Sequence, residues 1–471
     1  MRLKSSSASL IRKSQRINRM VIENRIFFVT GFPRSGTTAL ARLLNASRSM
    51  VCIIEGNVIN RFRGVLSRRQ VLNEPYEDLC ADLYTTVYKN FFKTARYHQN
   101  TQLIVSPPTL TSFVEAFRQD LKQVSDTESL LARLCHRYFR MLGKMTDFRT
   151  VGEKVPDYID FPHILYKIFP TCRILFIQRD PRAVVHSILN FIRNTFHLFA
   201  VPNAFAMAFS WLIRNKTMDH FISNHPGLTL KIAQERLKSD PKDIAERTSE
   251  FLGVSLDAQM TNFAKHMMQT STVKNWQSEM ADEDIMAVEG VISQYAEYSS
   301  LYPCHADPLC NPYAQKAASL TPLSTCSIEK ISHIINNAVP LFRDRKDKQI
   351  MGLTLLQFGD YAHRQVDFDR AYLLYSKSEK YNFSQPQFWF KWGELCFDMK
   401  LLSDAKKHYT KALSLMSGNN YYKFLSAKSL YQLGRIERLE GRNRSAVDFF
   451  YQSLNVFPSF YLPKQMLKII S

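Results

Sequence analysis

The chain has 471 residues, of which 45% are hydrophobic, so it is long enough for two or three domains and too apolar for a disordered or fibrous protein. It carries 62 Lys and Arg residues against 42 Asp and Glu residues. This net charge of +20 predicts an anionic partner, such as a nucleic acid, a membrane surface or a small anion.

The N-terminal segment, residues 1–24, is basic, and we expect it to be solvated and partly mobile. No stretch of the chain reaches the roughly 18 apolar residues that a membrane-spanning helix needs. No apolar run follows the basic segment before residues 26–29, so we expect no signal peptide. The eight cysteines form no Cys-x-x-Cys pair, which favours reduced thiols over a zinc or redox motif. These features predict a cytoplasmic protein without a membrane span.

Residues 25–300 show short apolar runs that alternate with amphipathic segments. We predict strands at 26–29, 173–177 and 228–232, followed by helices at 38–46, 181–191 and 241–252. Because apolar residues are continuous in the first two runs, these strands are expected to be buried on both faces, as in a parallel sheet. The alternation of strands and helices predicts an α/β fold.

The C-terminal third changes to a purely helical pattern that repeats. Residues 301–330 show no clear period and are interpreted as a connection, and residues 331–471 as the helical domain. The set Gly359, Ala371 and Tyr375 recurs as Gly393, Ala405 and Tyr409, and again as Gly434, Ala446 and Phe450. The small residues allow two helices to approach closely, and the aromatic residue fills the space between neighbours.

These units resemble tetratricopeptide repeats, and Trp389, Trp392 and Ala412 agree with that pattern. The alternative is an unrelated helical bundle with a chance spacing, which three copies in register argue against. The resemblance implies an array of paired helices whose grooves suit a protein partner or self-association.

A glycine-rich loop, Gly31 to Thr38, lies between the first predicted strand and helix. Its Gly-x4-Gly spacing is that of a loop whose backbone N–H groups hold an oxyanion at a helix N-terminus. Thr37 stands where nucleoside triphosphatases and P-loop kinases have a lysine, and Arg34 supplies a cation instead. A P-loop kinase or triphosphatase is therefore disfavoured.

The string Pro-Arg-Ser-Gly-Thr-Thr in this loop resembles the 5′-phosphosulfate loop of sulfotransferases that use 3′-phosphoadenosine 5′-phosphosulfate (PAPS). The resemblance covers about residues 25–300 and implies a sulfotransferase domain with a P-loop-like parallel sheet. It assigns donor binding to Arg34, Ser35, Gly36, Thr37 and Thr38.

A second block, Arg179 to Ser187, follows the predicted strand at 173–177. In the sulfotransferase family, an arginine and a serine at these positions bind the donor's 3′-phosphate, which implies that role for Arg179 and Ser187. A guanidinium group and a hydroxyl are suited to a dianionic phosphate. Arg182 and His186 in the same block receive no assignment.

Two further positions match the tyrosylprotein sulfotransferase branch of the family. Glu55 lies 17 residues after Thr38, where that branch has its general base. Lys154 lies 25 residues before Arg179, where a lysine stabilises the transferring sulfuryl group, a role shared with Arg34. Each has a plain alternative, a solvated carboxylate for Glu55 and a surface cation for Lys154.

A third block, Gln234 to Pro241, is similar to a family segment that normally begins with tyrosine, and Gln234 has no phenol hydroxyl to make that tyrosine's contact. Ser271, Lys274 and Trp276 lie where the family often closes over the donor.

The resemblance implies an enzyme that transfers a sulfuryl group from PAPS to the hydroxyl of a protein tyrosine, a glycan or a small molecule, releasing adenosine 3′,5′-bisphosphate (PAP). No metal is expected, because the sulfuryl group carries less charge than a phosphoryl group and no metal-ligand cluster is visible. The alternative is an inactive scaffold that binds PAP or PAPS and uses its repeats to bind a protein. A nucleic-acid binder is suggested by charge alone, and no recognition motif supports it.

Overall fold

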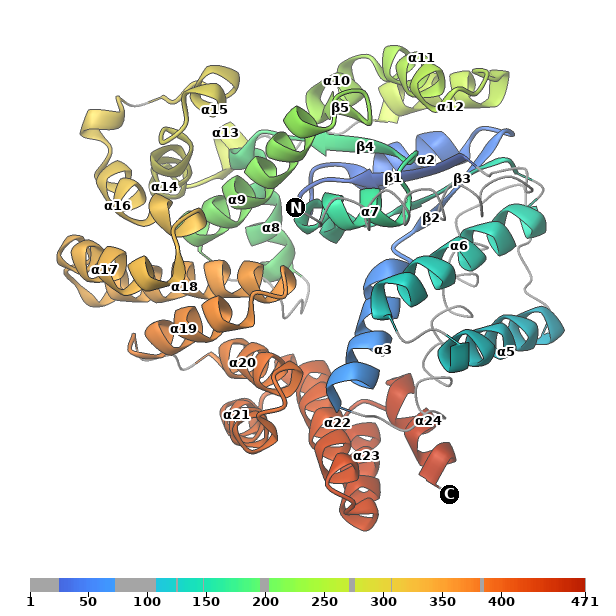
Figure 1. Ribbon diagram of the computed structural model, residues 1–471. Helices are drawn as coiled ribbons and strands as arrows, with labels where there is room; N and C mark the ends of the chain where they lie inside the picture. The colour runs from blue at the N-terminus through green and yellow to red at the C-terminus, as the bar shows by residue number, and fades with distance from the viewer. Residues whose placement is uncertain are drawn as a thin grey trace, which may run out of the picture.

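The structure is a computed structural model. It describes residues 25–72, 107–123, 126–146, 148–194, 203–270, 276–305, 307–381 and 385–470. The basic segment 1–24, together with Ser271 and Lys274, lies outside the described residues. Figure 1 shows two parts, a sheet covered by helices and a curved array of helices that ends at the C-terminus.

The sheet has five parallel strands in the order β2-β3-β1-β4-β5. The strands are β1 (Arg25–Thr30), β2 (Met50–Ile54), β3 (Thr150–Lys154), β4 (Arg173–Gln178) and β5 (Thr229–Ala233). The α/β fold predicted from the sequence is therefore confirmed, and β1, β4 and β5 lie where strands were predicted. Strands β2 and β3 were not predicted.

Alternate residues of the strands supply two hydrophobic cores, because successive side chains of a strand point to opposite faces. On one face Phe27, Cys52 and Leu175 are buried against α2 (Thr37–Asn45), α11 (Pro241–Leu252) and α12 (Ala258–Thr270). On the other face the cover consists of α6 (Thr127–Thr146), α7 (Pro162–Ile168), α8 (Pro181–Asn194) and α9 (Ala204–Asn224). The sheet is thus covered on both faces, as a parallel sheet requires.

The remaining elements of this part are short or peripheral. They are α3 (Val58–Leu72), α5 (Pro107–Gln123), the 3-10 turn η1 (Pro156–Asp160), α10 (Gln234–Ser239), α13 (Trp276–Glu279), α14 (Asp282–Ile292) and α15 (Ala296–Leu301). Helix α11 has the boundaries that the sequence predicts. Asp240 accepts a hydrogen bond from the Asp243 backbone N–H at its start, and Gly253 ends it in the left-handed conformation.

The predicted connection is largely helical. It contains η2 (Pro308–Cys310), α16 (Pro312–Leu320), η3 (Thr321–Ser324) and α17 (Ile328–Ala338), followed by η4 (Val339–Leu341). The buried residues of α16 and α17 belong to the same hydrophobic cluster as the sheet face that α9 covers. The core therefore continues from the sheet into the C-terminal helices, and the domain boundaries at 300 and 330 stay predictions.

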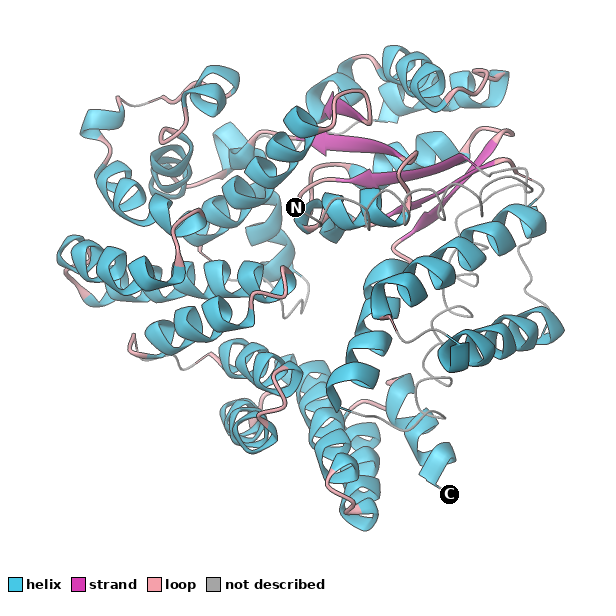
Figure 2. Ribbon diagram, viewed as in Figure 1, coloured by secondary structure: helices cyan, strands magenta, loops and turns pink. Residues whose placement is uncertain are grey.

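The C-terminal part is an array of paired helices, which confirms the predicted helical region (Figures 1 and 2). The pairs are α18 (Arg345–Arg364) with α19 (Phe368–Glu379), α20 (Pro386–Asp398) with α21 (Leu402–Met416), and α22 (Lys423–Leu439) with α23 (Asn443–Val456). The short turn η5 (Asn420–Tyr422) precedes α22, and α24 (Tyr461–Ile470) follows the last pair.

The repeated glycines mark the closest approach within each pair. A Cβ atom added at Gly359, Gly393 or Gly434 would lie 2.6 to 2.7 Å from the ring of the aromatic residue 16 positions later. Those rings, on Tyr375, Tyr409 and Phe450, are fully buried. The glycine is needed at these positions because any side chain would collide with the ring.

Each pair also turns at an equivalent residue, seven positions after the repeated glycine. Val366, Lys400 and Gly441 have φ values of 65°, 63° and 79°, which is the left-handed region. The residue after each donates its backbone N–H to a carbonyl five positions earlier, as in a Schellman motif. The same turn recurs three times although only one copy has glycine, so the sequence alone does not reveal it.

Charged residues join the two parts in a buried cluster. Arg214 on α9 pairs with Asp160 at 2.8 Å, and Arg364 on α18 pairs with Asp157 at 3.2 Å. Lys391 on α20 pairs with Asp360 on α18. Burial opposes ionisation of Asp360, yet Lys391 and the two arginines hold its pKa below the ordinary value. In the described part of the chain, no helix is long and apolar enough to cross a membrane.

Candidate active site

The predicted site residues gather at one edge of the sheet. Because all five strands are parallel, the arrows in Figure 2 run in the same direction and their carboxyl ends share one edge. Residue Lys154 at the end of β3 is in register with Ile54 of β2 and Val29 of β1. Ligands of open α/β sheets bind at this edge.

The loop between β1 and α2 leaves donors open at the start of α2. Gly36 is the N-cap of α2, has a φ of 93° and supplies no side-chain cap. A Cβ at this position would lie 2.9 Å from Cγ of the buried Gln234, so glycine is required on both conformational and steric grounds. The first N–H groups of a helix have no partner within it, and they favour an anion.

Two side chains of this loop agree with an anion site. The Ser35 hydroxyl is buried and has no hydrogen-bond partner among the residues that the structure describes. Arg34 has a φ of 71° and is exposed. Thr37 is buried, and Thr38 is half-buried. A buried hydroxyl without a partner costs free energy, so a ligand oxygen at this position would stabilise the loop.

The two motif blocks of the sequence meet at this loop. Arg34 Nε donates to Ser187 Oγ at 3.1 Å, and Arg179 Nη1 donates to the Arg34 carbonyl at 2.9 Å. The Arg34 guanidinium group also lies 4.9 Å from the centre of the Phe191 ring. Burial lowers the pKa of Arg179, with a smaller lowering from Arg34 and an opposing effect of Glu235 and Asp180. Two cations and two hydroxyls therefore lie around one short loop.

Lys154 and Glu55 form an ion pair at the same edge. Lys154 Nζ lies 2.8 Å from Glu55 Oε1. The Lys154 side chain is fully buried, whereas 58% of the Glu55 side chain is exposed. The Glu55 backbone N–H donates to the Lys154 carbonyl at 2.8 Å, which fixes one residue against the other. The structure thus brings together two residues that are 99 positions apart in the sequence.

The residue before Lys154 is a functional candidate that sequence reasoning missed. Glu153 Oε1 accepts the backbone N–H of Val58 at 3.1 Å, and the Tyr158 hydroxyl donates to Glu153 Oε2 at 2.5 Å. The Tyr158 hydroxyl accepts the backbone N–H of Ile59 at 3.2 Å. Burial raises the pKa of Glu153 to about 7, against the opposing effect of the Tyr158 hydrogen bond. The signal in the sequence that could have revealed Glu153 was its charge within a strand.

Lys238 on α10 is a second residue that the motifs did not reveal. It is half-buried, and burial together with nearby Arg179 lowers its pKa. Within the described ranges Lys238 has no hydrogen bond and no salt bridge, and the nearby Glu235 carboxylate only opposes the lowering of its pKa. An unpaired cation beside Arg179 favours an anion at this position.

Other residues of the motif blocks have structural contacts. Arg182 is buried, pairs with Asp180 and Glu289 at 2.8 Å each, and lies 4.4 Å from the centre of the Trp276 ring. His186 Nε2 lies 3.1 Å from Glu279. Among the residues that the structure describes, neither side chain has a hydrogen bond or ion pair with the loop Gly31–Thr38. Trp276 therefore packs on Arg182.

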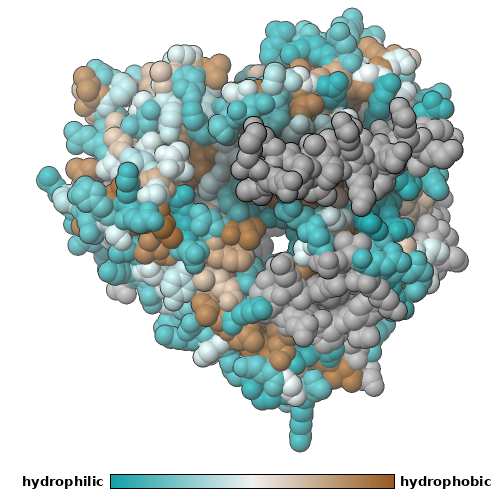
Figure 3. Space-filling model, in the orientation of Figure 1, coloured by the Kyte–Doolittle hydropathy of each residue, from teal (hydrophilic) through white to brown (hydrophobic). Residues whose placement is uncertain are grey.

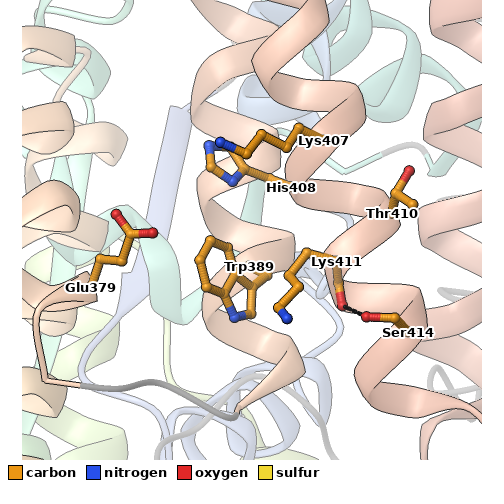
Figure 4. A pocket seen from close by; sticks show the side chains of 7 residues that line it. All are labelled: Glu379, Trp389, Lys407, His408, Thr410, Lys411 and Ser414. Carbon is orange, nitrogen blue, oxygen red and sulfur yellow. Dashed lines mark hydrogen bonds between the residues drawn. The ribbon is translucent and has the colours of Figure 1, made fainter.

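The helical array carries a separate surface groove of about 430 Å³ (Figure 4). Trp389, His408, Lys407 and Lys411 line it, and Figure 4 shows Glu379 across from them on α19. Trp389 and His408 are nearly parallel, with ring centres 5.5 Å apart. In Figure 3, hydrophobic residues also gather on the lower part of the molecule, over the array. This groove is not part of the site at the strand ends.

Comparisons with known proteins give one family match, within the α/β part, and several solved structures. No curated protein matches the chain. Among solved structures, the sulfotransferase STF9 from Mycobacterium avium is 15% identical, with a TM-score of 0.37 over 63% of this chain and 81% of that chain. The sulfotransferase domain of the Synechococcus PCC 7002 olefin synthase is 18% identical, with a TM-score of 0.34 over 69% of this chain and 97% of that chain. Residues 27–258 match the family model described as the sulfotransferase family, and this match supports a sulfuryl-transferring enzyme.

Proposed function

We propose that the protein transfers a sulfuryl group from PAPS to an acceptor hydroxyl. One observation carries the proposal: Arg34 contacts both Arg179 and Ser187, at the same edge of the sheet as the Lys154–Glu55 pair. The family match of residues 27–258 supports the reaction class, whereas the donor and the residue roles are part of the proposal.

The donor would be held by its two anionic ends. The amides at the start of α2, with Ser35, Thr37 and Thr38, face the 5′-phosphosulfate. Arg179 and Ser187 hold the 3′-phosphate, which gives preference over nucleotides that lack it. PAPS supplies an activated sulfuryl group whose leaving group is PAP.

Glu55 and Lys154 have different roles in the proposed reaction. The acceptor oxygen forms a bond to sulfur, the bond from sulfur to the phosphate oxygen breaks, and the acceptor proton passes to the Glu55 carboxylate. Glu55 is exposed enough for an acceptor to reach it. Lys154 and Arg34 stabilise the charge on the oxygens of the transferring group, because a buried ammonium with one hydrogen bond has donors to spare.

The C-terminal helices form, in this proposal, a tetratricopeptide-type array over residues 331–471, preceded by the sulfotransferase domain and the connection 301–330. The array binds a protein partner or a second copy of the chain. The acceptor is a protein tyrosine, a glycan or a small molecule, and the Glu55–Lys154 pair favours the tyrosylprotein-like branch.

Calorimetric titration with PAP tests the donor site without knowledge of the acceptor. Arg179→Ala is expected to weaken PAP binding by about 10- to 100-fold, because it removes a charge-assisted hydrogen bond. Arg173→Ala is the matched control, since Arg173 begins β4, at the end of the strand away from Arg179, and donates to the Gly227 carbonyl.

ATP with magnesium serves as the competing ligand in the same experiment. The proposal predicts PAP binding that depends on Arg179, little ATP binding, and release of PAP from PAPS when a hydroxyl acceptor is added. Absence of PAP binding in the wild-type protein would refute the proposed donor, and equal weakening by both arginine variants would refute the proposed phosphate contact.

A further inference from the structure

Glu55 lies in a three-residue connection, residues 55–57, between β2 and α3. Glu55 and Asn57 have φ values of 58° and 55°, in the left-handed region, which asparagine tolerates and which is unfavourable for glutamate. Such a backbone conformation persists only where its surroundings hold it. The contacts at the two ends of this connection therefore decide where the Glu55 carboxylate lies.

Both ends of the connection are held by adjacent residues of β3. At the first end, the Glu55 backbone N–H donates to the Lys154 carbonyl. At the second end, Glu153 accepts the N–H of Val58, the first residue of α3. Glu153 and Lys154 are consecutive, so the backbone of β3 sets the distance between the two attachment points.

Tyr158 completes the second attachment. Its hydroxyl donates to Glu153 at 2.5 Å and accepts the N–H of Ile59 at 3.2 Å. Glu153 and Tyr158 are both fully buried. Together they bind the first two N–H groups of α3, which have no partner within the helix. This is an N-terminal cap supplied from elsewhere in the chain, in place of a capping side chain before α3.

We propose that Glu153 and Tyr158 are positioning residues that hold the start of α3 so that Glu55 remains against Lys154. That these residues position Glu55 is argued from hydrogen bonds. That this position matters for catalysis rests on the proposed function. Among the described residues, neither side chain has a hydrogen bond to the loop Gly31–Thr38, so donor binding is expected not to depend on them. A displacement of a reacting group by about 1 Å can lower a rate about 100-fold. Loss of the cap of α3, which would displace Glu55, is therefore expected to lower the transfer rate.

A double-mutant cycle on stability distinguishes positioning from simple packing. The Glu55→Ala substitution shifts the urea midpoint in the wild-type protein by removing the partner of Lys154. In a Tyr158→Phe background Glu55 is released from Lys154, so the Glu55→Ala shift is expected to shrink by at least half. Glu153→Gln, which keeps the size and an acceptor oxygen, is expected to reduce the shift less.

Tyr298→Phe is the matched control. The Tyr298 hydroxyl donates to Asp219 at 2.5 Å, which reproduces the tyrosine–carboxylate contact away from the sheet edge. The Glu55→Ala shift is expected to be unchanged in this background. Amide hydrogen exchange at Val58 and Ile59 should accelerate in Tyr158→Phe and stay at the wild-type rate in Tyr298→Phe.

Function is measured in the same variants by PAP calorimetry and by transfer of labelled sulfate from PAPS to a phenol. Tyr158→Phe should leave the PAP dissociation constant within twofold and lower the transfer rate by about 10- to 100-fold. An undiminished Glu55→Ala shift in Tyr158→Phe, or an unchanged transfer rate, would overturn the inference. A diminished shift in a protein that neither binds PAP nor transfers sulfate would overturn the proposed function and leave the positioning of Glu55 supported.

Discussion

Removing either member of the Lys154–Glu55 pair should affect stability very differently, because the two side chains differ in exposure. The Lys154 side chain is fully buried, and Glu55 is its one hydrogen-bond partner among the described residues. Glu55 has 58% of its side chain exposed to solvent. Without Glu55 the ammonium group is left buried and uncompensated, whereas without Lys154 the carboxylate remains largely solvated.

The magnitude follows from this asymmetry. Removing one partner of a fully buried ion pair costs about 3–5 kcal/mol. Water screens part of this pair, so we expect Glu55→Ala to cost about 2 kcal/mol of the free energy of unfolding. Lys154→Met replaces the buried charge by an apolar chain of similar volume and should cost less than about 1 kcal/mol. The double variant should match Lys154→Met alone.

Urea unfolding of the wild type, both single variants and the double variant gives the four free energies of unfolding that this double-mutant cycle compares. The reasoning is refuted if Lys154→Met destabilises the protein as much as Glu55→Ala, or if the double variant shows the sum of the two costs. Addition of PAPS should stabilise Glu55→Ala more than the wild type, because its anionic group would compensate the buried ammonium.

Three further predictions address pH, donor binding and the array. Since the pKa of Glu153 is about 7 in the folded protein and 4.5 ordinarily, its contribution to stability is fully present below about pH 4.5 and falls by about 3 kcal/mol as the pH rises to about 7. Urea unfolding across this range should show that slope in the wild type, and Glu153→Gln should flatten it. Lys238→Gln should weaken PAP binding about tenfold in calorimetry, because a charge-assisted contact is lost, whereas Lys231→Gln should not. Gly441→Val should lower the free energy of unfolding by about 1–2 kcal/mol through backbone strain alone, since no atom lies within 4 Å of its added Cβ, and Lys400→Gly should cost nothing.

The sequence predicted those parts of the fold in which local pattern and tertiary role agree. The apolar run of β1 and the run of β4 are each followed by an amphipathic helix, and both strands were found. Strand β3 reads Thr-Val-Gly-Glu-Lys, which contains two charged residues and no alternation. The strand can be buried because Glu153 accepts a hydrogen bond from Tyr158 and Lys154 is paired with Glu55. The sequence pattern alone does not show these partners.

In the candidate site, too, some residues could be predicted from the sequence and others only from tertiary contacts. The motif resemblance assigned Arg34, Arg179 and Ser187 to the site, and in the structure Arg34 contacts each of the other two. Spacing cannot reveal that Glu153 holds the start of α3, because Val58 and Ile59 take part through their backbone N–H groups. The roles of all these residues in binding and catalysis stay predictions.

Backbone strain supplies an argument for the site that does not depend on motifs. Among the described residues, five non-glycine residues have positive φ values, and Val366 and Lys400 are two of them. These two lie at repeat turns equivalent to Gly441, so the geometry of the helical pair explains their conformation. They need no function.

The other three, Arg34, Glu55 and Asn57, lie at the carboxyl edge of the sheet. The left-handed conformation costs about 1–2 kcal/mol for Arg34 and for Glu55, whereas asparagine tolerates it, and no repeat geometry accounts for these residues. Hydrogen bonds hold two of them instead: Arg179 donates to the Arg34 carbonyl, and the Glu55 N–H donates to the Lys154 carbonyl. A loop without this strain would lose these hydrogen bonds and would point these side chains elsewhere. The strain is therefore best explained by the direction it gives to the Arg34 guanidinium group and the Glu55 carboxylate.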